Sequence, residues 1–83
     1  MITDDMLTVG TRLLCIKDHY RYVKDTVYEI QRVDNEKRPY PLYGIRDNSS
    51  FSLTNLNYVF IMYDSLPEKV KFLYELTGKI KNV

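Results

Sequence analysis

Cys15 and His19 are the two side chains whose types and proximity in the sequence could support nucleophilic catalysis. A cysteine nucleophile needs a nearby base to form its thiolate at neutral pH, and histidine is a common base. No third residue is marked as a partner that would orient the imidazole, and one cysteine with one histidine do not make a structural zinc site. We therefore expect Cys15 to be a small buried apolar residue, and we predict no catalytic site, no metal site and no cofactor.

A second candidate site is a segment that mixes basic and aromatic side chains, His19-Tyr20-Arg21-Tyr22-Val23-Lys24. Tyrosine and arginine are enriched among the residues that dominate protein–protein binding. The same residue types can stack on bases and contact phosphates in single-stranded nucleic acid. A third interpretation is a solvated loop whose tyrosines pack on the edge of the fold. The predicted partner-binding residues are Tyr20, Arg21, Tyr22, Lys24, Arg38 and Tyr40.

The charge balance favours a protein partner over nucleic acid. The chain has 83 residues and a formal net charge of +1, whereas proteins that hold phosphate backbones by bulk attraction usually carry a clear positive excess. Acidic residues also interrupt the basic set, namely Asp18, Asp25, Asp34 and Glu36. We predict a non-catalytic protein-binding module, with nucleic-acid binding through the same loop as the alternative.

Several features predict a cytoplasmic protein without a membrane segment. The single cysteine cannot form an intramolecular disulfide. Asp4 and Asp5 stand where a signal peptide would need positive charge, and the longest apolar run, residues 58–63, is too short to span a bilayer. The length suits a single domain over residues 1–83.

The alternation of apolar residues predicts a mainly β region over residues 9–62. We expect strands at residues 11–17, 27–33, 42–46, around Phe51 and Leu53, and at 58–62, with one tight helical turn at 55–57. In the first strand Leu13 and Cys15 face one way and Leu14 and Ile16 the other, so both faces are expected to be covered, one of them by a later helix. Gly44 inside a strand indicates a bulge or a close approach of another stretch of backbone.

A helix is expected over residues 66–77. Ser65 and Glu68 have the spacing of a capping box, and Gly78 is a natural stop after Thr77. Apolar residues form one broad stripe along this helix, widened by Phe72: Leu66, Val70, Leu73, Tyr74 and Leu76. We expect the stripe to dock on the β region, and self-association into a homo-oligomer through this helix is a second use for it.

The motifs Val9-Gly10-Thr11, Cys15-Ile16-Lys17-Asp18, Val27-Tyr28-Glu29-Ile30 and Val59-Phe60 resemble those of small SH3-like proteins of tailed bacteriophages over residues 9–62. The resemblance implies a five-stranded SH3-like barrel, followed here by a C-terminal α-helix. Many such phage proteins bind a host protein, which implies an accessory protein that inhibits a host target in the host cytoplasm. A glycine usually precedes the second strand in these chains, whereas Asp25-Thr26 stands there here. The acidic loop and tryptophan of peptide-binding SH3 domains are missing, so binding of proline-rich ligands is not implied.

Overall fold

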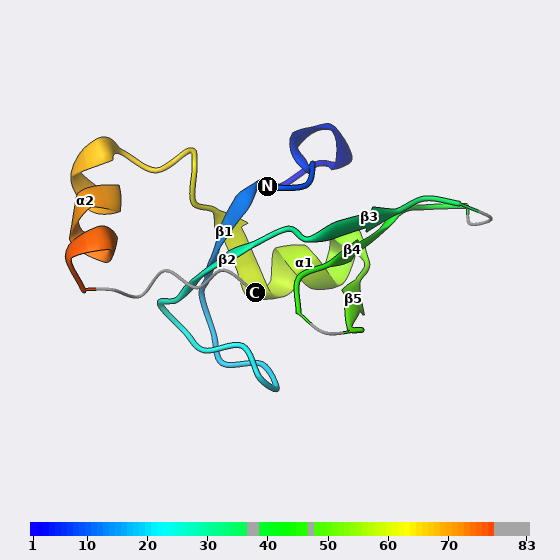
Figure 1. The fold of residues 1–83 in the computed structure, drawn as a ribbon, viewed down its shortest axis with the longest axis horizontal. Helices are drawn as coiled ribbons and strands as arrows, with labels where there is room; N and C mark the ends of the chain where they lie inside the picture. The colour runs from blue at the N-terminus through cyan, green and yellow to red at the C-terminus, as the bar shows by residue number, and fades with distance from the viewer. Residues whose placement is uncertain (37–38, 47, 78–83) are drawn as a thin grey trace.

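The structure is a computed structural model that describes residues 1–36, 39–46 and 48–77 (Figure 1). Its elements form a small α+β fold with two three-stranded antiparallel sheets, ordered β2–β1–β6 and β3–β4–β5. In chain order they are η1 (Asp4–Met6), β1 (Arg12–Cys15), β2 (Val27–Glu29), β3 (Arg32–Asp34), β4 (Leu42–Gly44), β5 (Ser50–Phe51), α1 (Leu53–Val59), β6 (Phe60–Met62) and α2 (Glu68–Thr77).

The predicted five-stranded SH3-like barrel is wrong. Among the described residues, the six strands form two separate sheets, and no strand ladder closes them into a barrel. The strand predicted at residues 27–33 divides where the backbone changes its partners. The N–H of Ile30 donates to Thr11 O at 2.8 Å, beside the first sheet, whereas the N–H of Gln31 donates to Gly44 O at 2.8 Å, in the second. The chain therefore passes from one sheet to the other between these two residues.

A second departure from the barrel is α1, which occupies residues predicted to be strand and turn. Ser52 starts this helix, because its hydroxyl accepts a hydrogen bond from the N–H of Asn55 at 3.2 Å. Leu56 and Val59 follow at helical spacing and are fully buried. The helix thus takes the place of the single turn predicted at 55–57 and leaves only Phe60–Met62 for β6.

The prediction that β1 is covered on both faces is confirmed for its central residues. Leu13 and Cys15 belong to the main core, which also holds the rings of Tyr22, Tyr28, Tyr43, Phe51 and Phe60. Leu14 belongs to a second cluster with Val27 and Tyr63, against which Leu66 and Tyr74 pack. The sheet β2–β1–β6 therefore lies between the main core and the C-terminal helix.

α2 begins at Glu68 rather than at residue 66. The carbonyl of Pro67 accepts the first helical hydrogen bond, from the N–H of Lys71 at 3.1 Å, so Ser65 lies outside the helix that it was predicted to cap. The hydroxyl of Tyr63 donates to Lys71 O at 3.0 Å and holds the helix on the sheet. Neither this helix nor any other in the described part of the chain has the length and apolar character needed to cross a bilayer.

The N-terminal segment is tied to the body of the fold by side chains from distant elements. Asn57 on α1 accepts a hydrogen bond from the N–H of Ile2 at 2.8 Å and donates to Ile2 O at 2.9 Å. The hydroxyl of the buried Tyr43 on β4 donates to the carboxylate of Asp4 in η1. Burial raises the pKa of the Tyr43 hydroxyl, and the bond to the Asp4 carboxylate raises it further. Residues 1–8, which precede the β region predicted from the sequence, therefore contribute to the packed structure.

Candidate binding site at the turn between β1 and β2

The connection between β1 and β2 contains a tight turn made by His19, Tyr20, Arg21 and Tyr22, here called the 19–22 turn. In Figure 1 this long connection hangs below the two sheets, on the side opposite η1. His19 and Tyr22 exchange two backbone hydrogen bonds, of 3.0 and 2.9 Å, which leave Tyr20 and Arg21 at the tip. Tyr20 has a φ of 54°, at a position in two-residue turns where glycine is usual.

Tyr20 and Tyr22 have opposite environments although both were predicted to contact a partner. Tyr20 is 94% exposed and Tyr22 is 4% exposed. The ring of Tyr22 makes edge-to-face contacts with Tyr28, Phe51 and Phe60 at centroid distances of 5.1, 5.2 and 5.6 Å. Tyr22 is therefore the anchor that fixes the turn to the core, with little of its surface left exposed.

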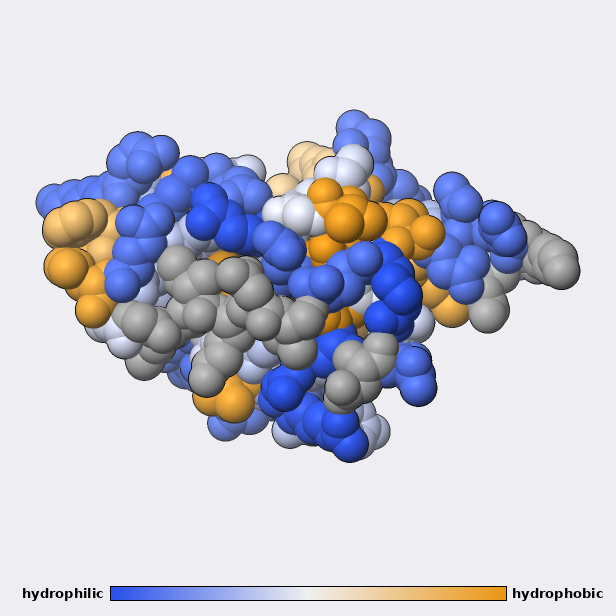
Figure 2. Space-filling view, in the orientation of Figure 1, coloured by the Kyte–Doolittle hydropathy of each residue, from blue (hydrophilic) through white to orange (hydrophobic). Residues whose placement is uncertain are grey.

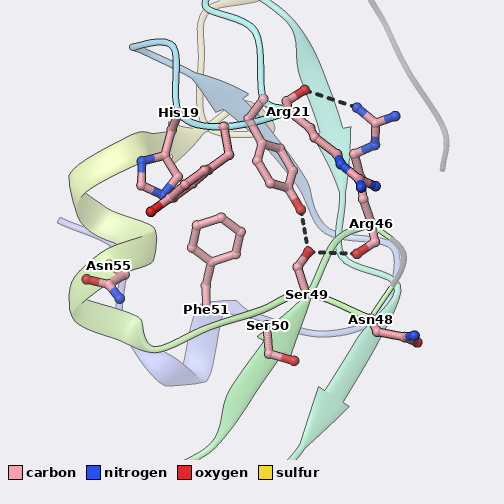
Figure 3. Close-up of a pocket in the computed structure, with 10 residues that line it drawn as sticks. His19, Arg21, Arg46, Asn48, Ser49, Ser50, Phe51 and Asn55 are labelled. Carbon is pink, nitrogen blue, oxygen red and sulfur yellow. Dashed lines mark hydrogen bonds between the residues drawn. The ribbon is translucent and has the colours of Figure 1, made fainter.

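Hydrogen bonds from the β4–β5 connection hold the turn in place (Figure 3). The hydroxyls of Tyr22 and Ser49 share a hydrogen bond of 2.9 Å, and Ser49 Oγ donates to Arg46 O at 2.7 Å. Arg46 Nη1 donates to Arg21 O at 3.1 Å, directly at the tip of the turn. Two connections that are far apart in the sequence therefore hold each other in position.

Between these two connections lies an open pocket with a volume of about 630 Å³. His19, Arg21 and Arg46 give it three basic side chains, and none of its described lining residues is acidic. The ring of His19 lies edge-on to Tyr20 at 4.6 Å and tilted to Phe51 at 5.9 Å. Polar neutral side chains complete the wall around Phe51 (Figure 3): Asn48, Ser49, Ser50 and Asn55. The pocket, here called the turn pocket, combines positive charge, aromatic rings and hydrogen-bonding groups.

The structure brings together only some of the predicted partner-binding residues. Tyr20, Arg21 and Tyr22 line the turn pocket. Lys24 is exposed and does not line it, and its backbone N–H donates to Asp18 Oδ1 at 2.8 Å. Tyr40 is 58% exposed but lies beside a different hollow, which it shares with Pro41 and Leu53. Arg38 lies outside the described residues.

The residues that complete the turn pocket were missed in the sequence. The composition of Asp47-Asn48-Ser49 predicts a turn, yet nothing in the local pattern shows that Arg46 reaches the tip of another connection. Asn55 was assigned only to a single helical turn, whereas α1 places it on the wall of the pocket. When residues that are distant in the chain meet in the fold, a single sequence shows no periodic pattern that predicts the contact.

Cys15 and His19 are engaged in different interactions. The thiol of Cys15 is fully buried and donates to Lys17 O at 2.9 Å, while the imidazole of His19 packs on Tyr20 and Phe51. Burial raises the pKa of the Cys15 thiol, whereas a cysteine nucleophile needs a lowered one. In residues 1–36, 39–46 and 48–77, no three His, Cys, Asp or Glu side chains gather in a group that could hold a metal ion.

Comparisons with known proteins add no relative to this description. No protein-family model, no curated protein and no solved structure matches the chain. The resemblance to small phage proteins therefore stays a prediction based on short motifs, and the geometry of the turn pocket is the basis for any functional proposal.

Proposed function

We propose that this protein is a non-catalytic protein-binding module whose contact surface is the 19–22 turn and the turn pocket. The observation that carries this proposal is the position of Tyr20. Its ring is 94% exposed, and its backbone has a φ of 54°. Left-handed backbone at a residue other than glycine costs about 1–3 kcal/mol, and such strain gathers at functional sites. A contact with a partner gives a physical reason for holding a large ring in water at this cost.

The support beneath the turn suits recognition of a protein surface. Tyr22 is buried in the core and Arg46 holds the carbonyl of Arg21, so Tyr20 and Arg21 are displayed on an ordered backbone. A contact surface that is already ordered loses less conformational entropy on binding. Tyrosine and arginine are also the residue types that most often dominate interface energies. We propose that the protein acts by covering a functional surface of its target, as phage accessory proteins do when they inhibit host proteins in the bacterial cytoplasm.

Nucleic-acid binding is a second candidate because the same pocket joins basic and aromatic side chains. The two candidates differ in their dependence on salt. A protein that neutralises several phosphates loses affinity steeply as salt rises. On a double-logarithmic plot the binding constant falls with salt concentration, with a slope roughly equal to the number of phosphate contacts. A protein interface centred on Tyr20 has a weaker salt dependence, since its main contribution comes from burial of an aromatic ring.

The test is capture from a nuclease-treated bacterial extract with the immobilised full chain. We expect one dominant protein to be retained at physiological salt, and we expect Tyr20→Ala to lose most of it. Tyr40→Ala is the matched control, because Tyr40 is exposed beside a different hollow. Equal capture by Tyr20→Ala and the unaltered chain would show that the turn is not the contact surface. Retention of nucleic acid before nuclease treatment, lost between about 50 and 200 mM salt, would favour the second candidate.

A further inference from the structure

We infer that the turn pocket accepts an acidic side chain of the partner protein, an inference that rests on the function proposed above. Three basic side chains, His19, Arg21 and Arg46, line the pocket, and its described lining residues include no carboxylate. Arginine is well suited to this task because its planar guanidinium can donate two parallel hydrogen bonds to one carboxylate. A segment with an aspartate or glutamate would complement this charge.

The guanidinium of Arg46 has hydrogen-bonding capacity that the fold leaves unused. Its Nη1 donates to Arg21 O at 3.1 Å. Its Nε is buried, and none of the described residues accepts a hydrogen bond from it. A buried donor without an acceptor is destabilising, and nearly all such groups in proteins find a partner. A carboxylate in the pocket would put an acceptor beside this guanidinium.

The dimensions of the turn pocket fit a short segment rather than an isolated ion. A volume of about 630 Å³ is large for one carboxylate group. The rings of Tyr20 and His19, which contact each other at 4.6 Å, can pack together against the backbone beside the acidic residue. Asn55 and Ser50 can bond to its peptide groups (Figure 3). The hollows near the N-terminus differ, because Met1, Ile2 and other apolar side chains dominate their walls.

A phosphate backbone would use the same arginines but fits the surroundings less well. Asp18 stands next to His19 on the same connection, where its carboxylate accepts from the backbone N–H of Lys24. The formal net charge of +1 provides little long-range attraction for a chain of phosphates. One acidic side chain needs only the pocket itself.

The test is an NMR titration of the ¹⁵N-labelled full chain at physiological salt with three probes. These are a capped Gly-Glu-Tyr-Glu-Gly peptide, its neutral Gly-Gln-Tyr-Gln-Gly counterpart and a short oligothymidylate, each up to millimolar concentration. We expect the acidic peptide to shift the amide signals of His19, Arg21 and Asn48 and to bind about tenfold more tightly than the neutral one, as loss of a charge-assisted hydrogen bond predicts. Arg21→Gln should weaken this binding about tenfold. Lys24→Gln, which removes the same charge outside the pocket, should have little effect.

Equal binding of the two peptides, binding of the oligothymidylate alone, or no binding of any probe would each overturn the inference. An equal effect of Lys24→Gln and Arg21→Gln would also overturn it, since attraction would then come from general charge. The capture experiment separates this failure from failure of the proposed function. If Arg21→Gln still captures the partner while Tyr20→Ala does not, the acidic ligand is wrong and the binding surface stands.

Discussion

Positive φ at residues other than glycine occurs, within the described residues, at Tyr20 with 54° and Asp25 with 67°. Asp25, two residues before β2, adopts a backbone conformation that glycine reaches without strain. Aspartate tolerates this backbone because its short side chain can bond locally. Tyrosine lacks this local compensation, and the strain at Tyr20 supports the proposal that its ring contacts a partner.

Replacement of Tyr20 by glycine separates stability from binding. We expect Tyr20→Gly to leave the free energy of unfolding unchanged or to raise it by up to about 1 kcal/mol, because glycine removes the left-handed strain. Partner capture should be lost. Asp25→Gly changes the other described non-glycine residue of positive φ and should retain capture. Urea unfolding measures the stability, and a clear loss of stability in Tyr20→Gly would show that the ring serves the fold instead.

Gly44 shows how a single residue supports the site from a distance. The guanidinium of Arg32 occupies the space that a Cβ on Gly44 would need, so a side chain, and not the backbone predicted from the sequence, approaches this glycine. In that position Arg32 Nη2 donates to Ser49 O at 2.9 Å. Ser49 in turn bonds to Tyr22, so the absence of a side chain at Gly44 helps to position the wall of the turn pocket.

At the scale of elements, α2 has two different surfaces. Leu66, just before the helix, and Tyr74 within it pack on the β2–β1–β6 sheet, and Tyr74 contacts Tyr63 edge-to-face at 6.0 Å. Three apolar side chains of the same helix are more than half exposed: Phe72, Leu73 and Leu76. Figure 2 shows the corresponding apolar surface over α2 at one end of the molecule. Docking on the sheet therefore uses only part of the broad apolar stripe seen in the sequence.

Self-association through the exposed part of α2 stays a prediction. We expect a concentration-dependent homodimer in sedimentation-equilibrium measurements, because burial of exposed apolar surface is worth about 25 cal/mol per Å². Phe72→Glu should abolish the dimer without lowering thermal stability of the monomer, since Phe72 is exposed. Lys69→Glu, another exposed position on the same helix, is the control. A purely monomeric unaltered chain at high concentration would contradict the prediction.

At the scale of the whole molecule, one cysteine thiol and three tyrosine hydroxyls make the free energy of unfolding depend on pH in the alkaline range. Burial is the main cause of raised pKa values for the Cys15 thiol and for the hydroxyls of Tyr43, Tyr63 and Tyr74. These groups ionise less readily in the folded chain than in the unfolded one, so above their ordinary pKa values of 9.0 and 10.0 the folded chain binds more protons. The free energy of unfolding should therefore fall as pH rises above about 9.

Urea unfolding at pH 7, 9 and 10.5 measures this dependence. The contribution of these groups is fully present below pH 9 and is lost progressively above it. Tyr43→Phe removes one of the linked groups and should make the decline between pH 9 and 10.5 shallower, although it also removes the bond to Asp4. A free energy of unfolding that stays constant or increases over this range would contradict the assignment.

The sequence by itself determined which faces of the central strand are buried. Leu13 and Cys15 alternate with Leu14, and a pleated strand must send them to opposite faces, as the two core clusters confirm. It also indicated the C-terminal helix and the basic and aromatic character of the turn. Each of these features depends on the periodicity or the chemistry of a short segment, so the residues of that segment are sufficient to predict it.

Only the tertiary structure decided that the strands form two separate sheets, that Tyr22 is an anchor while Tyr20 is displayed, and that Arg46 and Asn55 complete a pocket. Each of these depends on contacts between residues that are distant in the chain. A tyrosine has the same local preferences whether it is buried or exposed, and the choice depends on the free energy of packing against Phe51 and Phe60, which no neighbouring residue encodes.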